Sequence, residues 1–259
     1  GTMSNDVYGG GALADTNKGN WDVTNNTWAQ GKTSATYTTT VNLTGGTING
    51  TAYGGGLGSK PTLTNTTAEN VPAYVYGDVL VKLNENTNDN YKVLKIHGCN
   101  NLNGSPKGDV TVHVYRTVAF GDETHKKPST TNGNNVVPLK NNTTFDMDAV
   151  YGGGNEAAYI PIESTSVANV IIEGCSDTSI KTVYGGGNAA SAPGTHVLVN
   201  SCYEIGTVFG GGNGLDDLED GTPNFGAHVG YKPAVYTYDS NKTDEENLAA
   251  AEAAFEAQK

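Results

Sequence analysis

An aromatic residue followed by three glycines recurs along this chain, and no other feature of the sequence restricts the fold as strongly. The longest form, a valine, an aromatic residue, three glycines and an asparagine, is found at 150–155, 183–188 and 208–213. Copies at 7–11 and 52–56 lack the asparagine, and a weaker copy, Val75-Tyr76-Gly77-Asp78, keeps one glycine. Five glycine triplets behind an aromatic residue indicate a repeat protein, in which each unit packs on its neighbours.

Each repeat unit has the pattern of two short strands joined by a tight turn. Segment 170–175 leads to 180–185, 197–202 leads to 205–210, and 41–46 leads to 48–54. Apolar and polar residues alternate in these segments, and alternation with a period of two predicts β-strands. We therefore expect an all-β solenoid. Its loop insertions are predicted at about 15–36, 58–72, 84–91, 120–146 and 214–232.

The glycine triplet predicts a backbone corner at which side chains do not fit. In a solenoid, equivalent corners lie about 4.8 Å apart, which is the spacing of strands in a sheet. We expect the glycines to form a column, the tyrosines an aromatic stack and the asparagines an amide ladder. A glycan platform made of the tyrosines is the alternative interpretation. A phosphate-binding loop is not indicated, because neither Lys-Ser/Thr nor a helix pattern follows the triplet.

The three cysteines are an odd number, which excludes a fully paired internal disulfide framework. Cys99, Cys175 and Cys202 each follow an apolar strand residue by five positions, and Gly46 holds the same place after Val41. We expect these four residues to form one inward-facing file of small side chains. Buried, unlinked thiols are the favoured interpretation, since free cysteine is among the most buried residue types. A bond between stacked neighbours and a metal site are the alternatives, although no CxxC or HxxxH pair supports zinc.

The net charge of −12 and the single arginine, Arg116, exclude the basic surface that nucleic-acid binding requires. Anionic membranes and acidic polysaccharides are disfavoured partners for the same electrostatic reason. No apolar run approaches the length of about 18 residues that would span a membrane. Neutral glycans, cations and other proteins are the partners that the composition leaves open.

The last part of the chain changes character and predicts a helix. Thr243-Asp244-Glu245-Glu246 is a capping box, and apolar residues recur at helical spacing after it. We expect a repeat domain over 1–240 and a C-terminal segment over 241–259, whose helix from about 244 to 257 caps the stack or links to a further region. Because Gly1-Thr2-Met3 resembles the remnant of a cloning vector, we also expect the chain to be part of a longer protein.

The unit of strand, glycine pair, isoleucine and Val-Tyr-Gly-Gly-Gly-Asn resembles a repeat family found in large, multi-coil surface proteins of gut Bacteroidetes and some Firmicutes. The resemblance covers 41–56, 147–158, 170–190 and 197–214 well, and 3–12, 73–83 and 91–119 loosely. It implies a right-handed parallel β-helix, secreted or attached to the bacterial cell surface, and it implies no particular activity. The lost triplet at Tyr76-Gly77-Asp78 and the long insertions depart from the family pattern, so uniform stacking is in doubt between about 84 and 146.

One segment suggests a calcium site. Residues 211–218 fit the calcium-binding nonapeptide G-G-x-G-x-D-x-U, and the segment with its two following residues offers the carboxylates of Asp216, Asp217, Glu219 and Asp220. The motif works in tandem elsewhere and occurs once here, so a solvated acidic loop is the other interpretation. No cofactor besides calcium is predicted.

A first set of candidates for catalysis consists of carboxylates around the triplet at 152–154. Asp146, Asp148 and Glu156 flank this corner. Paired carboxylates hydrolyse glycosides when they are about 5–9.5 Å apart. Because acidic residues are abundant in this chain, ordinary surface positions explain the same three residues.

A second set combines the only arginine with nearby histidines. His113 and Arg116, together with His97 and Tyr115, would line one groove if the strands near 91–99 and 110–117 were adjacent. Polysaccharide lyases on β-helices use a basic residue as proton acceptor, and a groove of this kind would suit such chemistry. Acidic substrates would be repelled by the net charge, and ordinary surface positions are again the other interpretation.

Aromatic residues in or beside the insertions are the candidates for ligand binding. They are Trp21, Trp28, Tyr74 and Tyr115, and insertions are the parts of a solenoid that are free of packing duties. We expect a non-enzymatic module, a structural or adhesive stalk that binds a neutral glycan or a host protein. The alternatives are a carbohydrate-active enzyme, either a polysaccharide hydrolase or a lyase on a pectinase-like β-helix, and a spacer without a ligand.

Overall fold

The computed structural model describes residues 1–61, 67–118, 145–214, 226–230, 241 and 243. Within these ranges the protein is all-β, with two parallel sheets and one small antiparallel hairpin. The helical segments of the described part are two short 3₁₀ turns, η1 (Lys18–Asn20) and η2 (Ser34–Thr36). The predicted C-terminal helix over 244–257 lies outside the described residues.

The larger sheet has seven strands and contains the segments that precede the glycine corners. Its strands are β1 (Thr2–Met3), β2 (Val7–Tyr8), β6 (Gly45–Tyr53), β8 (Asn90–His97), β10 (Met147–Tyr151), β12 (Ser179–Tyr184) and β14 (Glu204–Phe209). They pair in the order β1-β6-β8-β10-β12-β14, with β2 also on β6, and every pairing is parallel.

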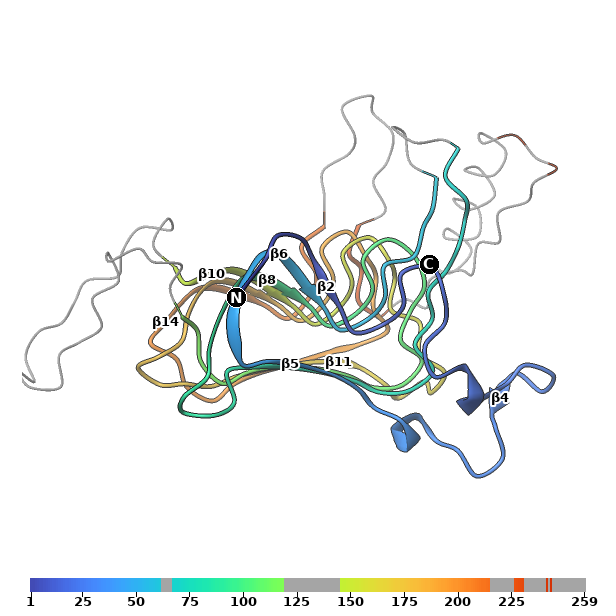
Figure 1. Cartoon of the computed structure of the whole chain (residues 1–259), viewed down its shortest axis with the longest axis horizontal. Helices are drawn as coiled ribbons and strands as arrows, with labels where there is room; N and C mark the ends of the chain where they lie inside the picture. Colours follow the sequence, from blue (N-terminus) through green and yellow to red (C-terminus); the bar gives the residue numbers. More distant parts are fainter. Residues whose placement is uncertain (62–66, 119–144, 215–225, 231–240, 242, 244–259) are drawn as a thin grey trace, which may run out of the picture.

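The smaller sheet has five strands, which are also parallel. They are β5 (Thr39–Leu43), β7 (Val79–Leu83), β9 (Val110–Val114), β11 (Ala168–Ile172) and β13 (Thr195–Val199), and they pair in this order. Along the chain each of them is followed by a strand of the larger sheet, from β5 and β6 to β13 and β14. We call one strand of the smaller sheet together with the strand of the larger sheet that follows it a pass of the chain. From β5 onward, each pass adds one strand to each of the two layers seen in Figure 1, whereas the first pass supplies only β1 and β2 to the larger sheet.

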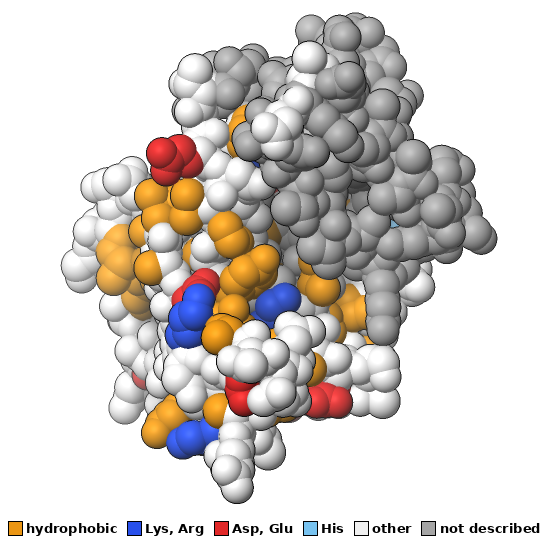
Figure 2. Space-filling view, turned by 90° about the vertical axis from the view of Figure 1, so that its right-hand side faces the viewer, with side chains coloured by type: hydrophobic (Ala, Val, Ile, Leu, Met, Phe, Trp, Pro, Cys, Tyr) orange, Lys and Arg blue, Asp and Glu red, His pale blue; other side chains and the backbone are white. Residues whose placement is uncertain are grey.

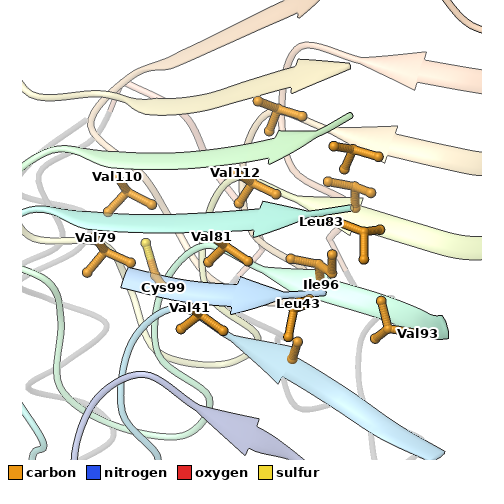
Figure 3. Packing of buried hydrophobic residues seen from close by; sticks show 14 of the residues in the cluster. Val41, Leu43, Val79, Val81, Leu83, Val93, Ile96, Cys99, Val110 and Val112 are labelled. Atoms are coloured by element: carbon orange, nitrogen blue, oxygen red, sulfur yellow. The ribbon is translucent and has the colours of Figure 1, made fainter. Parts of the chain in front are cut away.

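The core lies between the two sheets. Parallel pairing in register places the same type of residue at equivalent positions of adjacent strands. One file of the five-stranded sheet consists of Val41, Val81, Val112, Val170 and Val197. In β9, Val110 and Val114 are buried with this file, whereas Thr111 and His113 lie on the other face, as the alternation in the sequence predicts. Figure 3 shows side chains of both sheets meeting in the interior, where burial of each valine contributes about 1.5–3 kcal/mol.

The glycine corners form the predicted column of closely packed backbone. The N–H of Gly152 donates to the carbonyl oxygen of Tyr184 in the next pass at 3.0 Å, and the other corners repeat this bond. A Cβ atom on Gly54, Gly98, Gly152 or Gly185 would lie 2.3–2.4 Å from the carbonyl oxygen of the corresponding residue one pass further on. Real side chains do not approach backbone so closely, so only glycine fits these positions.

The side chains that precede the corners form one stack of rings. Its members are Tyr8, Tyr53, His97, Tyr151, Tyr184 and Phe209, with adjacent ring centroids 4.3–5.2 Å apart and planes within 17° of parallel. This confirms the predicted aromatic stack, but its third place belongs to His97. The prediction that 75–78 is a copy of the motif is wrong, because Val75 bridges to Thr16 and Pro106 outside both sheets.

The asparagines after the corners form the predicted amide ladder. Asn213 Nδ2 donates to Asn188 Oδ1, Asn188 donates to Asn155, and Asn155 donates to Asn101, each at 2.9 Å. Asn101 Nδ2 in turn donates to the hydroxyl of Tyr8 at 2.8 Å. Asn101 belongs to the same pass as the histidine of the ring stack, so this pass has kept the ladder while losing the glycine triplet.

The predicted inward file of Cys99, Cys175, Cys202 and Gly46 is wrong. Cys99 takes the place of a middle corner glycine, since its N–H donates to the carbonyl oxygen of Gly153 at 3.3 Å. Cys175 and Cys202 follow strands of the five-stranded sheet, and Gly46 lies within the first part of β6, whereas Cys99 comes after the end of β8 in the larger sheet. Cys175 is moreover exposed, so the remaining positions do not all face inward.

The predicted insertions differ in how much they interrupt the sheets. The first contains both 3₁₀ turns and an antiparallel hairpin of β3 (Trp21–Asp22) and β4 (Thr27–Trp28). The third, predicted at 84–91, is shorter, because β8 already begins at Asn90. Most of the insertions predicted at 120–146 and 214–232 lies outside the described residues.

Substitution of Gly185 by alanine should destabilise the protein far more than the same substitution at Gly210. Both residues open a triplet, but a Cβ on Gly185 would lie 2.4 Å from the Gly210 carbonyl oxygen, whereas no described atom lies within 4 Å of one on Gly210. We expect Gly185→Ala to cost about 1–3 kcal/mol or more, and Gly210→Ala to change the free energy of unfolding by less than about 0.5 kcal/mol. Urea unfolding followed by circular dichroism checks this, and equal midpoints for the two variants would contradict the close-packed corner.

Candidate binding site

The hairpin of the first insertion brings the two tryptophans together. Asp22 Oδ1 accepts the backbone N–H groups of Thr24 and Asn25 at 2.9 and 3.2 Å, and Asn26 takes the left-handed conformation that asparagine tolerates. This turn pairs β3 with β4 so that Trp21 lies opposite Trp28. The two indoles meet edge to face with centroids 5.7 Å apart, an arrangement that aromatic pairs favour.

Two tyrosines extend this pair toward the body of the protein. Val75 is fully buried, and its neighbours Tyr74 and Tyr76 make ring contacts with each other at a centroid distance of 6.0 Å. Trp21 stacks on Tyr76 with centroids 5.6 Å apart. The side-chain amide of buried Asn20 donates to the carbonyl oxygen of Tyr76 at 2.8 Å, which fixes the hairpin to this segment. Trp21, Trp28, Tyr74 and Tyr76 are called the aromatic cluster below.

Charged groups border the aromatic cluster and are held by hydrogen bonds. Trp28 Nε1 donates to Glu163 Oε1 at 3.3 Å. Lys107 Nζ lies 4.6 Å from the centre of the Tyr74 ring and donates to the carbonyl oxygen of Ile160 at 3.1 Å. Figure 2 views the right-hand face of Figure 1, toward which the hairpin extends, and shows hydrophobic side chains gathered beside basic ones. The cluster therefore combines apolar ring faces with polar groups in fixed positions.

Burial changes the acidity of the groups in this cluster. Desolvation lowers the pKa of Lys107 to about 8, against the weaker opposing effect of Asp15. Burial also raises the pKa of Tyr74 and of Tyr76 above the ordinary value, with a further increase from Asp15. Both phenols are therefore neutral hydrogen-bonding groups at neutral pH, and Lys107 is the group whose charge is easiest to remove.

Three of the four predicted binding residues come together in this cluster, although they derive from two separate segments. Trp21, Trp28 and Tyr74 are half-buried, so part of each ring is open to solvent, while Tyr76 is buried and supports them. Tyr115 is elsewhere: its ring stacks on His113 at 3.7 Å, and its hydroxyl donates to Glu85 at 3.2 Å. Cross-strand pairing of the tryptophans was not predicted, although the Asp-Val-Thr-Asn-Asn run between them is a turn signal.

Two charged residues of this site, Lys107 and Glu163, were also not predicted. Each reaches the cluster from a different pass of the chain, Lys107 just before β9 and Glu163 just before β11. No local motif marks them in the sequence. Their place beside the rings follows only from the stacking of the passes.

The predicted catalytic carboxylates do not share one environment. Asp146 is buried and accepts a hydrogen bond from the Thr117 hydroxyl at 2.6 Å. Asp148 is exposed on β10, and Glu156, beyond the corner, forms an ion pair with Lys60 at 3.3 Å. Asp146 precedes the first residue of β10, so the alternation of a strand does not place it on the same face as Asp148.

The predicted groove of basic residues is not formed. His97 is buried in the ring stack of the seven-stranded sheet, whereas His113 belongs to the five-stranded sheet and pairs with Glu173 at 3.4 Å. The guanidinium of Arg116 donates to the carbonyl oxygens of Asn86 and Asp89 in the turn before β8. Arg116 therefore serves to fix a turn of the backbone.

The calcium prediction cannot be placed on the structure. Asp216, Asp217, Glu219 and Asp220 lie outside the described residues. Within the described ranges, no group of three or more His, Cys, Asp and Glu side chains is arranged to hold a metal ion. In the same part of the chain, no helix has the length and apolar character needed to cross a membrane.

Comparisons of the chain with protein-family models, with curated proteins and with solved structures found no match.

His97 is a buried histidine in the middle of the ring stack. Its side chain is 3% exposed and lies between the rings of Tyr53 and Tyr151, at centroid distances of 5.1 and 4.3 Å. Burial lowers its pKa to about 3. The folded protein thus holds a neutral imidazole at pH values where an unfolded chain, with a histidine pKa of about 6.5, has begun to take up a proton.

We predict that His97 makes the fold sensitive to mild acid. Its depressed pKa stabilises the protein fully above about pH 6.5, and this contribution is lost as the pH falls from 6.5 toward 3, amounting to about 2 kcal/mol at pH 5. Urea unfolding at pH 7 and pH 5 measures the loss. In His97→Tyr, which restores the ring type of the adjacent passes, the difference between the two pH values should shrink by about that amount. An unchanged difference would contradict the assignment to His97.

Proposed function

We propose that this chain is a non-enzymatic module of a secreted or surface-anchored bacterial protein, and that its aromatic cluster binds a neutral glycan. The observation that carries the proposal is the convergence of Trp21, Trp28 and Tyr74, each partly open to solvent, beside fixed polar groups. The export and the surface location rest on the resemblance of the Val-Tyr-Gly-Gly-Gly-Asn repeat to bacterial surface proteins.

We further propose that the two sheets are walls of one right-handed parallel β-helix. The proposal is supported by the regular alternation of the chain between the sheets and by the parallel register between successive passes. Right-handedness is supported by the general rule that crossovers between parallel strands of one sheet are right-handed in nearly all proteins. A stiff stack of this kind would hold the first insertion, with its hairpin, at a fixed place on the side of a stalk.

The chemistry of the cluster suits a sugar ring. Pyranose rings present C–H groups on their faces and hydroxyl groups at their edges. The indoles of Trp21 and Trp28 stand at 89° to each other, so a ring that packs on one indole face meets the second indole at its edge. Glu163 and Lys107 lie beside the rings, where a carboxylate and an amine can exchange hydrogen bonds with hydroxyl groups.

The electrostatics of the cluster favour a ligand without charge. Lys18 forms an ion pair with Asp15, and the cluster is contacted by one lysine, Lys107, and one glutamate, Glu163. The whole chain carries a net charge of −12, which repels anionic polysaccharides. Neutral hexose polymers are therefore the ligand class that we propose.

We propose no reaction for this chain. A glycosidase requires two carboxyl groups that face one substrate across a short gap. Of the predicted carboxylates, Asp146 is buried against Thr117 and Glu156 is paired with Lys60 on the other side of the corner. The carbohydrate-active enzyme stays an alternative that no described arrangement favours.

Titration calorimetry of the whole chain against a panel of neutral oligosaccharides tests the proposal. We expect at least one member of the panel to bind, and Trp28→Ala to weaken its binding about tenfold or more, because an aromatic anchor at the centre of an interface contributes about 1.4 kcal/mol or more. Tyr115→Ala is the matched control, since this tyrosine lies outside the cluster and should leave the affinity unchanged.

Two results would overturn the proposal. One is the absence of binding to every neutral glycan while a host protein is captured, which would assign the surface to the other partner class. The second is equal affinity of Trp28→Ala and Tyr115→Ala, with both variants folded by circular dichroism. That result would place the glycan on a different face.

A further inference from the structure

Two of the three cysteines occupy equivalent positions in successive passes of the chain. Strands β11 and β13 pair in register with Ile172 opposite Val199, and Cys175 and Cys202 each follow these residues by three positions. The turns that carry them stay side by side, because the N–H of Cys175 donates to the hydroxyl of Ser201 at 3.1 Å. Both thiols are free in this structure.

The distance between adjacent passes suits a disulfide. Neighbouring strands lie about 4.8 Å apart, and the Cα atoms of a disulfide are usually about 4.4–6.8 Å apart. Cys175 is exposed and Cys202 is partly exposed, so an oxidant has access to the pair. The pKa of the Cys202 thiol is raised by burial and additionally by the charge of Cys175, which agrees with two sulfur atoms in the same locality.

Cys99 provides an internal contrast. It is fully buried in a corner of the seven-stranded sheet, where its thiol donates to the Gly152 carbonyl oxygen at 3.7 Å. Burial raises its pKa well above the ordinary value, so the reactive thiolate is disfavoured. Cys99 is therefore a packed thiol of the core, and the two other cysteines, Cys175 and Cys202, remain as one pair.

We propose that Cys175 and Cys202 form a disulfide that ties the last two described passes together under oxidising conditions. The oxidant is a small disulfide such as oxidised glutathione. The exposed Cys175 thiolate attacks one sulfur of the oxidant and releases the first glutathione thiolate. The Cys202 thiolate then displaces the second, so that two protein thiols give up two protons and two electrons to one disulfide.

The test is to incubate the folded chain with oxidised glutathione and to count thiols and map peptides without reduction. We expect the free thiols to fall from three to one and the new link to join the peptides of Cys175 and Cys202. Cys99→Ser should form the same link, whereas Cys202→Ser should stop at a glutathione adduct on Cys175. The oxidised chain should unfold several degrees higher than the reduced chain, because the bond closes a loop between two passes.

Three outcomes would overturn the proposal. The first is the retention of all three thiols in the folded chain, and the second is a link that includes Cys99. The third is a Cys175–Cys202 link that forms only when the chain is first unfolded in urea, since the native arrangement would then not bring the pair together.

Discussion

The fold depends on backbone packed directly on backbone at the glycine corners. Each corner residue lies so close to the next pass that one added carbon atom at Gly54, Gly98, Gly152 or Gly185 would overlap a carbonyl oxygen. This close approach sets the distance between passes at the ends of β6, β8, β10 and β12. The rings before the corner stack on their equivalents in the adjacent pass, and the amides of Asn155, Asn188 and Asn213 after it also bond to their equivalents, whereas Asn101 donates to the hydroxyl of Tyr8.

Because equivalent side chains of adjacent passes stack on each other, the stack both stabilises the fold and tolerates a different residue in one pass. The ring stack keeps nearly parallel planes although one of its members is a histidine, because imidazole has the flat shape that the place requires. The cost is that this ring must stay uncharged. The amide ladder continues through Asn101 of the same pass, so the hydrogen bonds bridge a corner where Cys99 has replaced glycine. A pass can therefore lose its sequence signature and keep its place.

The repeats predicted the local structure well and the partners of single residues poorly. The aromatic stack, the amide ladder and the inward valines follow from period and spacing, because these features repeat with the passes. The pass that contains His97 was not recognised in the sequence, because His97-Gly98-Cys99 shares only one glycine with the motif. Tyr76 matches the motif better in sequence but lies outside both sheets. The sequence predicted most residues of the aromatic cluster but not that they come together. The two charged residues beside the rings, Lys107 and Glu163, belong to other passes and could not be predicted from local sequence.

The amide ladder has a mechanical consequence. Its bonds, like those of both sheets, run from pass to pass, and no described ladder bond joins passes that are not neighbours apart from the one between Asn101 and Tyr8. A pull on the two ends of such a stack acts on the outermost pass first. When that pass opens, it releases its own length of chain and relieves the tension before the next pass carries the load. If the chain serves as the stalk proposed above, we expect it to lengthen in steps under tension, with the inner passes opening after the outer ones.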